Sequence, residues 1–362
     1  WKITAKLLYK DEEKQAAEKN IDLKKGLNRG TLTFKIEDLP ISHYLLQFLI
    51  HDSQGRKIFN FDDFVFIQNR ERLSEYRNIL TQYKKIPKVS ASLSNLEIRL
   101  QWFADFYKKE NYEDISPLIG RQNDILYLIA KLEKGEAALF AKGTVKRYAH
   151  RSLIDNTLQP YSVFLPSTFR GDKKYPLIVA LHGSGVDERG FFGSFASSLG
   201  ILGCPILAPK ARGLSDWYTG ESGKDVFECI EHFLTLFPNI DREKIFLGGF
   251  SMGGYGTWLL GLRNPGYFKG LLILSGALAA PPETGGENIL KLLDSLDSLK
   301  GKDLLIIHGD KDNAVPIANT RKAVEKLKAL NAKFTYIEIS GAGHGNYNKF
   351  GEIIDWIRKH SE

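Results

Sequence analysis

The stretch Ile245-Phe-Leu-Gly-Gly-Phe-Ser251-Met-Gly-Gly-Tyr-Gly-Thr-Trp258 decides the fold. An apolar strand pattern runs directly into Gly249-Phe-Ser-Met-Gly253, and a helix pattern follows at once. A Gly-x-Ser-x-Gly turn between a buried strand and a helix is a nucleophile elbow, in which the glycines are needed because neighbouring backbone lies too close for a Cβ. The stretch therefore predicts a strained turn that exposes the Ser251 hydroxyl at the carboxyl edge of a sheet.

Around this turn, short apolar runs alternate with amphipathic helical patterns. The predicted strands are Val145–Ser152, Tyr161–Leu165, Leu177–Leu181, Pro205–Ala208, Ile245–Leu247, Leu271–Leu274, Leu304–Ile307 and Phe334–Ile339. The predicted helices are Val226–Phe237, Gly253–Arg263, Thr320–Leu330 and Gly351–His360. Continuously apolar strands that alternate with helices are typical of a mostly parallel sheet covered by helices on both faces. We therefore expect an α/β domain over residues 143–362.

A serine hydroxyl is a poor nucleophile at neutral pH and needs an adjacent base, which a carboxylate in turn orients. Two later strands run into candidates for these roles, in His308-Gly-Asp310-Lys-Asp312 and in Ile339-Ser-Gly-Ala-Gly-His344. Loops that leave the carboxyl ends of parallel strands meet at one edge of the sheet. We expect His344 to be the base and Asp312 the orienting acid, with Asp310 as the alternative carboxylate.

An acyl-transfer reaction also needs preorganised N–H donors for the oxyanion that forms. One expected donor is the Met252 amide, directly after the nucleophile at the start of a helix. The other comes from the loop Leu181-His-Gly-Ser-Gly185, in which Ser184 is the first choice and Gly185 the alternative. We expect His182 to hold this loop by hydrogen bonds, with a role as base as the alternative.

These motifs resemble those of the α/β-hydrolase family, and more narrowly its esterase branch related to polyhydroxybutyrate depolymerases, feruloyl esterases and prolyl-oligopeptidase-like predicted peptidases. The resemblance covers roughly residues 143–362 and is more specific for the fold and the triad than for the substrate. It implies a serine hydrolase that cleaves carboxylic esters, short-acyl, carbohydrate-linked or aromatic, through an acyl-enzyme on Ser251. A prolyl-oligopeptidase-like serine peptidase is the alternative. A catalytically inactive binding protein is a third possibility, against which the complete triad argues.

Three aromatic residues are candidates for the substrate pocket. Trp217 and Tyr218 lie on a glycine-rich loop after the Pro205–Ala208 strand, and Tyr255 lies one helical turn beyond Ser251. Packing in the core is the alternative for each of them. The connection that precedes Leu304 is too short for a large lid, so we expect an open cleft that suits hydrophilic or polymer-attached esters.

The N-terminal residues have a different pattern. Residues 1–68 read as strands and turns, with strands expected at 31–36, 44–50 and 64–67, and fit a small sandwich-like β module. Residues 69–142 have helical periodicity and fit a connector or cap. Modules of the first kind in related esterases assist carbohydrate binding or oligomerisation, which is an analogy only.

The composition excludes several classes of protein. With 362 residues, 43% hydrophobic and 26% charged, the chain is globular. The net charge of +7 is spread over mixed-sign segments, so we expect no nucleic-acid partner. No apolar run approaches the roughly 18 residues of a membrane span. We expect Cys204 and Cys229 to be buried free thiols.

No cofactor or metal is predicted, because no histidine pair has ligand spacing. Since the chain starts at Trp1 and its only methionine is Met252, we expect a natural N-terminal segment to precede it. A secreted or periplasmic location is therefore favoured over a cytoplasmic one.

Overall fold

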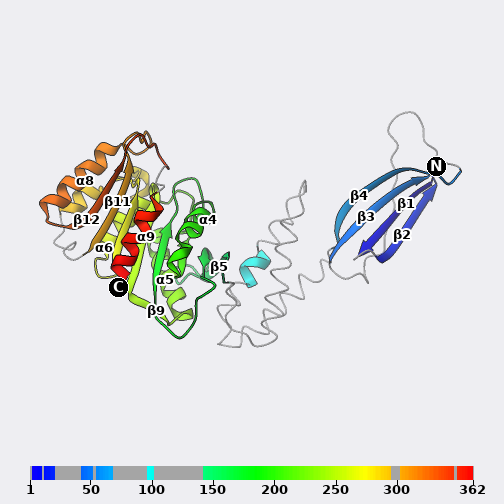
Figure 1. The fold of residues 1–362 in the computed structure, drawn as a ribbon, viewed down its shortest axis with the longest axis horizontal. Helices are drawn as coiled ribbons and strands as arrows, with labels where there is room; N and C mark the ends of the chain where they lie inside the picture. The colour runs from blue at the N-terminus through cyan, green and yellow to red at the C-terminus, as the bar shows by residue number, and fades with distance from the viewer. Residues whose placement is uncertain are drawn as a thin grey trace. The chain divides into compact units, whose positions relative to one another are not determined.

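The computed structural model describes residues 2–9, 12–20, 42–51, 54–67, 96–101, 142–294, 302–345 and 349–361 (Figure 1). The chain divides into two compact units. The first unit comprises Trp1–Val89 and Arg99–Gly135, and the second comprises Ser90–Ile98 and Glu136–Glu362. The three-part division expected from the sequence stays a prediction, because most of the helical segment over 69–142 lies outside the described residues. Within that segment, residues 96–101 are helical.

The first unit contains a four-stranded antiparallel sheet. Its strands are β1 (Lys2–Tyr9), β2 (Glu12–Asn20), β3 (Ser42–His51) and β4 (Lys57–Ile67), in the order β2-β1-β3-β4. The strands expected at 44–50 and 64–67 lie within β3 and β4, and the one expected at 31–36 lies outside the described residues. The described part of this unit has a single sheet, and the sandwich-like arrangement stays a prediction.

The second unit is built on an eight-stranded sheet with the order β12-β11-β10-β9-β7-β8-β6-β5. The strands are β5 (Val145–Arg151), β6 (Leu158–Phe164), β7 (Tyr175–Leu181), β8 (Ile206–Pro209), β9 (Ile240–Phe250), β10 (Gly270–Leu274), β11 (Asp303–Gly309) and β12 (Lys333–Ile339). Neighbouring strands from β7 to β12 pair in parallel, and β6 runs antiparallel to both β8 and β5. The mostly parallel sheet agrees with the expectation from the sequence.

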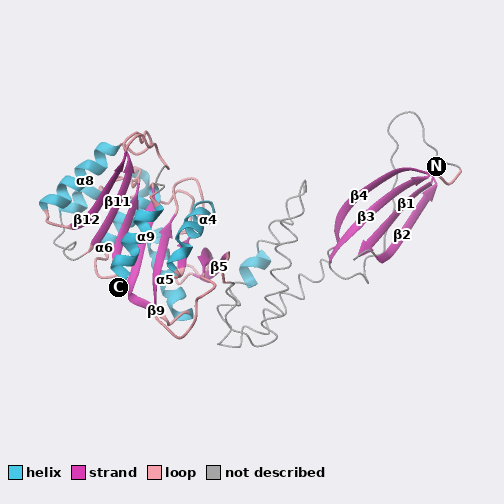
Figure 2. Ribbon diagram, viewed as in Figure 1, coloured by secondary structure: helices cyan, strands magenta, loops and turns pink. Residues whose placement is uncertain are grey.

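Helices cover both faces of this sheet, and Figure 2 shows them gathered around its strands. They are α4 (Glu188–Leu199), α5 (Gly220–Leu236), α6 (Met252–Arg263), α7 (Ile289–Asp294), α8 (Ile317–Ala329) and α9 (Phe350–Ser361). Alternate residues of β7 point to opposite faces. Val179 belongs to the core cluster that includes residues of α5, α6 and α8, and Ile178 belongs to the cluster that includes residues of α4 and α9. No helix of the described residues is long and apolar enough to cross a bilayer.

Helix α4 is absent from the elements that the sequence predicted. Its two glycines, Gly190 and Gly193, weaken the helical pattern. Asp187 caps the helix by accepting hydrogen bonds from two backbone amides of the first turn. Phe192 and Leu199 point from α4 into the core that covers one face of the sheet. Tertiary packing therefore stabilises a helix whose local sequence is a weak predictor of one.

Candidate active site

Ser251 lies at the turn between β9 and α6, where its backbone is strained. Its φ of 57° and ψ of −114° are rare for a residue with a Cβ, and such a conformation costs about 1–3 kcal/mol. The surrounding backbone holds it there. The Ser251 amide donates to the Leu274 oxygen at 2.9 Å, and the Ser251 oxygen accepts from the Tyr255 amide at 3.0 Å. The strain keeps the side chain at the carboxyl edge of the sheet.

The glycines of the elbow allow this turn to pack against the end of β7. A Cβ on Gly253 would lie 2.1 Å from the backbone oxygen of Leu181, and one on Gly249 would lie 2.3 Å from the oxygen of Gly253. Both distances are far below van der Waals contact, so only glycine fits. The loop after β7 also packs closely against the elbow. A Cβ on Gly183 would lie only 3.3 Å from the Phe250 ring.

The structure brings Ser251, His344 and Asp312 together, as the sequence predicted. The Nε2 atom of His344 lies 3.0 Å from the Ser251 Oγ, and its Nδ1 lies 2.7 Å from the Asp312 Oδ2. With the proton on Nδ1, the imidazole donates to the carboxylate and accepts from the serine hydroxyl. Asp312 is buried, whereas the His344 side chain is 26% exposed. The arrangement can remove a proton from Ser251 and hold the resulting imidazolium.

The environment keeps Asp312 ionised. Burial disfavours the charged form, but hydrogen bonds donated by His344 and by the Val315 amide outweigh it, so that the pKa of Asp312 lies below its usual value. Its Oδ1 accepts from the amides of Ala314 at 2.9 Å and Val315 at 2.7 Å. This leaves Oδ2 for His344. The carboxylate is therefore fixed in place before any substrate binds.

Asp310, the alternative acid, occupies a different position. Its Oδ1 accepts from the Gly341 amide at 2.7 Å, and its own amide donates to the Ile339 oxygen at 3.1 Å. Both contacts tie the loop after β11 to the loop that carries His344. Asp310 thus supports the histidine loop and is not part of the triad.

His308, which precedes both candidate acids in the sequence, is a functional residue that its motif alone did not reveal. This buried histidine at the end of β11 places Nε2 2.8 Å from the Val315 oxygen and 3.2 Å from the Asp312 Oδ2. Its Nδ1 lies 2.8 Å from the Thr320 hydroxyl. Burial lowers the pKa of His308, which favours the neutral ring. With the proton on Nε2, His308 donates to the Val315 oxygen, and the same Nε2 lies beside the oxygen of Asp312 that faces His344.

The expected oxyanion donors lie where the elbow meets the loop after β7. Met252 is the first residue of α6, and the first amides of a helix have no acceptor within that helix. Gly185, the alternative donor, is excluded because its amide donates to the Leu214 oxygen at 2.9 Å. The Ser184 side chain is held by the Ser215 hydroxyl at 2.7 Å. Met252 and Ser184 therefore stay the candidate pair.

His182 lies in the buried part of the same loop. Its Nδ1 and Nε2 each lie 2.9 Å from a backbone oxygen, those of Gly183 and Lys210. The Tyr218 hydroxyl donates to the His182 oxygen at 2.9 Å. Both ring nitrogens thus face backbone acceptors, which fits a residue that holds the loop.

The structure separates the three aromatic pocket candidates. Tyr218 and Tyr255 are buried. The Tyr255 hydroxyl donates to the Glu287 oxygen at 3.0 Å and accepts from the Glu287 amide at 2.8 Å. Burial and satisfied hydroxyls fit the packing role that was the alternative for both tyrosines, and their place in the substrate pocket stays a prediction. Trp217 is half-buried against Tyr255, with ring centroids 5.5 Å apart.

The second unit is similar in sequence to known hydrolases. Residues 219–361 match the Phospholipase/Carboxylesterase family. The chain is 28% identical over 239 residues to an endo-1,4-beta-xylanase/feruloyl esterase of Xylanibacter ruminicola, a match that covers 60% of this chain and 30% of that protein. The chain spans less than half the length of the curated relatives that it matches.

Solved structures give the same fold. A ferulic acid esterase superposes with a TM-score of 0.51 at 18% identity, over 61% of this chain and 98% of the other. A dipeptidyl peptidase 4 of Porphyromonas gingivalis superposes with a TM-score of 0.50 at 17% identity, over 64% of this chain and 37% of the other. These likenesses confirm the expected α/β-hydrolase fold. Esterases and peptidases both occur among the relatives.

Proposed function

We propose that this α/β-hydrolase is a serine hydrolase that cleaves carboxylic esters through an acyl-enzyme on Ser251. The observation that carries the proposal is the continuous hydrogen-bonded chain from the Ser251 Oγ through both ring nitrogens of His344 to the Asp312 Oδ2, at 3.0 and 2.7 Å. Such a chain is the means by which enzymes activate a serine hydroxyl at neutral pH.

In the acylation step, the Ser251 Oγ attacks the ester carbonyl carbon while His344 Nε2 takes the hydroxyl proton. Asp312 holds the imidazole in the required tautomer and stabilises the imidazolium. The carbonyl oxygen becomes an oxyanion, toward which the Met252 and Ser184 amides would donate. When the tetrahedral intermediate collapses, the bond to the alkoxy oxygen breaks and His344 returns its proton to the leaving alcohol.

In the deacylation step, a water molecule replaces the alcohol. His344 takes a proton from this water, whose oxygen attacks the acyl carbon of the Ser251 ester. Collapse of the second tetrahedral intermediate releases the carboxylic acid and returns the proton from His344 to Ser251. The residues required for both half-reactions all lie within the second unit.

Carbohydrate-linked or aromatic esters are the substrates that we favour. A feruloyl esterase is among the relatives, and the half-buried Trp217 offers an aromatic surface for an acyl group. Between β10 and β11, the described residues contain only the 3-10 turn Pro282–Thr284 and the short helix α7 as regular structure, which supports an open cleft. Because dipeptidyl peptidases are also relatives, a peptidase is the second candidate.

Side-by-side kinetics with p-nitrophenyl acetate, methyl ferulate and a proline p-nitroanilide would test the proposal. We expect both esters to be hydrolysed with a higher kcat/KM than the anilide, and Ser251→Ala to abolish turnover of all three while the protein stays folded. A higher kcat/KM for the anilide would make the peptidase the better assignment.

A further inference from the structure

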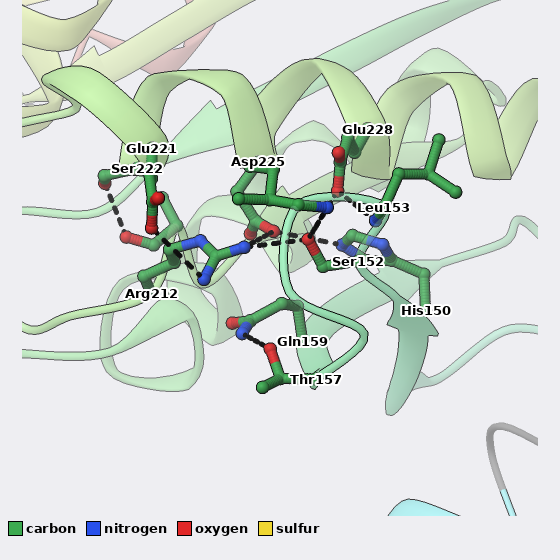
Figure 3. Close-up of polar contacts among 12 residues, drawn as sticks. His150, Ser152, Leu153, Thr157, Gln159, Arg212, Glu221, Ser222, Asp225 and Glu228 are labelled. Carbon is green, nitrogen blue, oxygen red and sulfur yellow. Dashed lines mark hydrogen bonds and ion pairs between the residues drawn. The ribbon is translucent and has the colours of Figure 1, made fainter.

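A second cluster of buried polar side chains lies where the hairpin β5–β6 meets α5. His150 is in β5, and Ser152 begins the turn that follows it. Asp225 and Glu228 belong to α5. Figure 3 shows both carboxylates projecting from α5 toward these hairpin residues. The ester-cleaving mechanism uses none of them.

Two members of this cluster are buried with unmet bonding capacity. His150 is 2% exposed and Asp225 is 1% exposed. Among the described residues, the His150 Nε2 and both carboxylate oxygens of Asp225 have no hydrogen-bond partner. The two groups face each other, with Nε2 3.7 Å from Oδ1. Buried polar groups nearly always have hydrogen-bond partners, so the unpaired atoms of His150 and Asp225 need an explanation.

The ligand atoms are close enough to share one ion. A nitrogen of His150 and one carboxylate oxygen each from Asp225 and Glu228 lie within 4.8 Å of one another. Ligands about 2.1 Å from a tetrahedral zinc lie about 3.4 Å apart, so small side-chain rotations would close the site. The hairpin also orients Glu228, whose Oε2 accepts from the Ser152 hydroxyl at 2.7 Å and the Leu153 amide at 3.1 Å. Such supporting bonds are usual around metal ligands.

We propose that His150, Asp225 and Glu228 bind one divalent transition-metal ion, of which zinc fits best. One imidazole nitrogen with two carboxylate oxygens is a donor set that suits zinc, whereas magnesium and calcium prefer oxygen donors alone. The remaining coordination position would be open to water. The ion would tie the hairpin β5–β6 to α5 and thus serve the structure of the domain.

The charges around the cluster agree with a divalent cation. The carboxylates of Asp155, Glu221, Asp225 and Glu228 face two cations, Arg212 and Lys210, so that two negative charges are left. Arg212 does not satisfy Asp225. Its Nη1 donates to the Asp155 Oδ2 at 2.6 Å and its Nη2 to the Ser152 hydroxyl at 2.7 Å, whereas the Asp225 Oδ1 is 3.9 Å away.

Metal content and binding in tag-free protein would test the site. We expect the protein purified without chelator to contain about one equivalent of zinc by plasma mass spectrometry, and the chelator-stripped protein to rebind one equivalent by calorimetry with a rise in Tm. Asp225→Asn and Glu228→Gln should each weaken zinc binding at least tenfold. The matched control is Glu221→Gln, on the same helix and beside Arg212 but outside the ligand set, which should bind zinc as the wild type does.

Three results would overturn the proposal. They are failure of folded, stripped wild-type protein to bind zinc at one equivalent, tight zinc binding retained in both ligand variants, and a preference for calcium or magnesium over zinc. If Asp225→Asn does not fold, the less buried Glu228→Gln decides. Ser251→Ala should retain the metal, so the outcome is independent of the ester-hydrolase proposal.

Discussion

At the scale of single residues, the orientation of His344 depends on how the two carboxylate oxygens of Asp312 are engaged. Oδ1 accepts hydrogen bonds from two backbone amides, and Oδ2 accepts one from the Nδ1 of His344. The carboxylate of the neighbouring Asp310 accepts a hydrogen bond from a backbone amide, that of Gly341, and orients no histidine. Two carboxylates of one turn therefore have separable roles, which substitution can distinguish.

Asp312→Asn should lower kcat/KM for p-nitrophenyl acetate about a thousand- to ten-thousandfold, because the amide would favour the wrong tautomer of His344. Asp310→Asn should change it by less than about threefold, since the amide oxygen can still accept from the Gly341 amide. Steady-state kinetics of the two variants, with circular dichroism as the check on folding, measures the difference. Equal losses in both variants would contradict the assignment.

His308 should act as a positioning residue for Asp312. Removal of its ring in His308→Ala would leave the Val315 oxygen and the Thr320 hydroxyl without their partner, and should destabilise the protein by about 1–3 kcal/mol. We expect kcat to fall more than KM changes, because the triad loses alignment while the substrate site is retained. His308→Gln, whose amide nitrogen can replace Nε2, should recover most of kcat. A role in stability alone predicts that kcat is unchanged in folded His308→Ala.

At the scale of secondary-structure elements, the sequence predicted most of the second unit correctly. The strand at 245–247 and the helix at 253–263 lie within β9 and α6, because strong apolar periodicity and the elbow motif act locally. Helix α4 was missed because packing, not local propensity, stabilises it. The burial of Tyr218 and Tyr255 could not be predicted either, since it depends on contacts with residues distant in the sequence, His182 and Glu287.

The packing of the elbow against β7 predicts a steric effect. In Gly253→Ala, the new Cβ would lie 2.1 Å from the backbone oxygen of Leu181, which cannot move aside as a flexible side chain could. This clash should lower the free energy of unfolding by about 1–3 kcal/mol or more. Since the clash displaces Ser251, ester hydrolysis should fall as well. Gly266→Ala is the matched control, because a Cβ there meets no atom within 4 Å. If Gly253→Ala and Gly266→Ala have the same stability in urea and the same rate of ester hydrolysis, this packing is contradicted.

The junction between the hairpin and α5 predicts a pH dependence of stability in chelator-stripped protein. His150 and His232 have pKa values lowered by burial to about 4 in the folded chain, against 6.5 when unfolded. Asp225 opposes them, since burial raises its pKa to about 7, against 3.8 when unfolded. Between pH 6.5 and 4, the unfolded chain thus binds two protons on the histidines, and the folded chain binds one on Asp225.

Because the unfolded chain binds one proton more, the free energy of unfolding should fall as the pH falls, by about 1.4 kcal/mol per pH unit. Urea titrations at pH 6.5, 5.5 and 4.5 measure this slope. Asp225→Asn removes the opposing group and should steepen it, whereas His150→Gln should flatten it. A stability that rises toward pH 4.5 would contradict these assignments.

At the scale of the whole molecule, the chain combines a unit of the α/β-hydrolase fold with a unit that contains an antiparallel β-sheet. The positions of Ser251, Asp312 and His344 directly after three strands predicted the triad, with Asp310 as the alternative acid, because parallel strands deliver their carboxyl ends to one edge of the sheet. The substrate was not predictable in the same way. It depends on the side chains that line the cleft, which tertiary packing selects from many exposed candidates.

Labelling of the intact protein with a fluorophosphonate, followed by peptide mass spectrometry, tests the central claim most directly. We expect a single adduct on the peptide that contains Ser251, and strongly slowed labelling in His344→Ala. Ser251→Ala should remain unlabelled. Folded wild-type protein that stays unlabelled, or an adduct that persists in Ser251→Ala, would contradict the claim that Ser251 is an activated nucleophile.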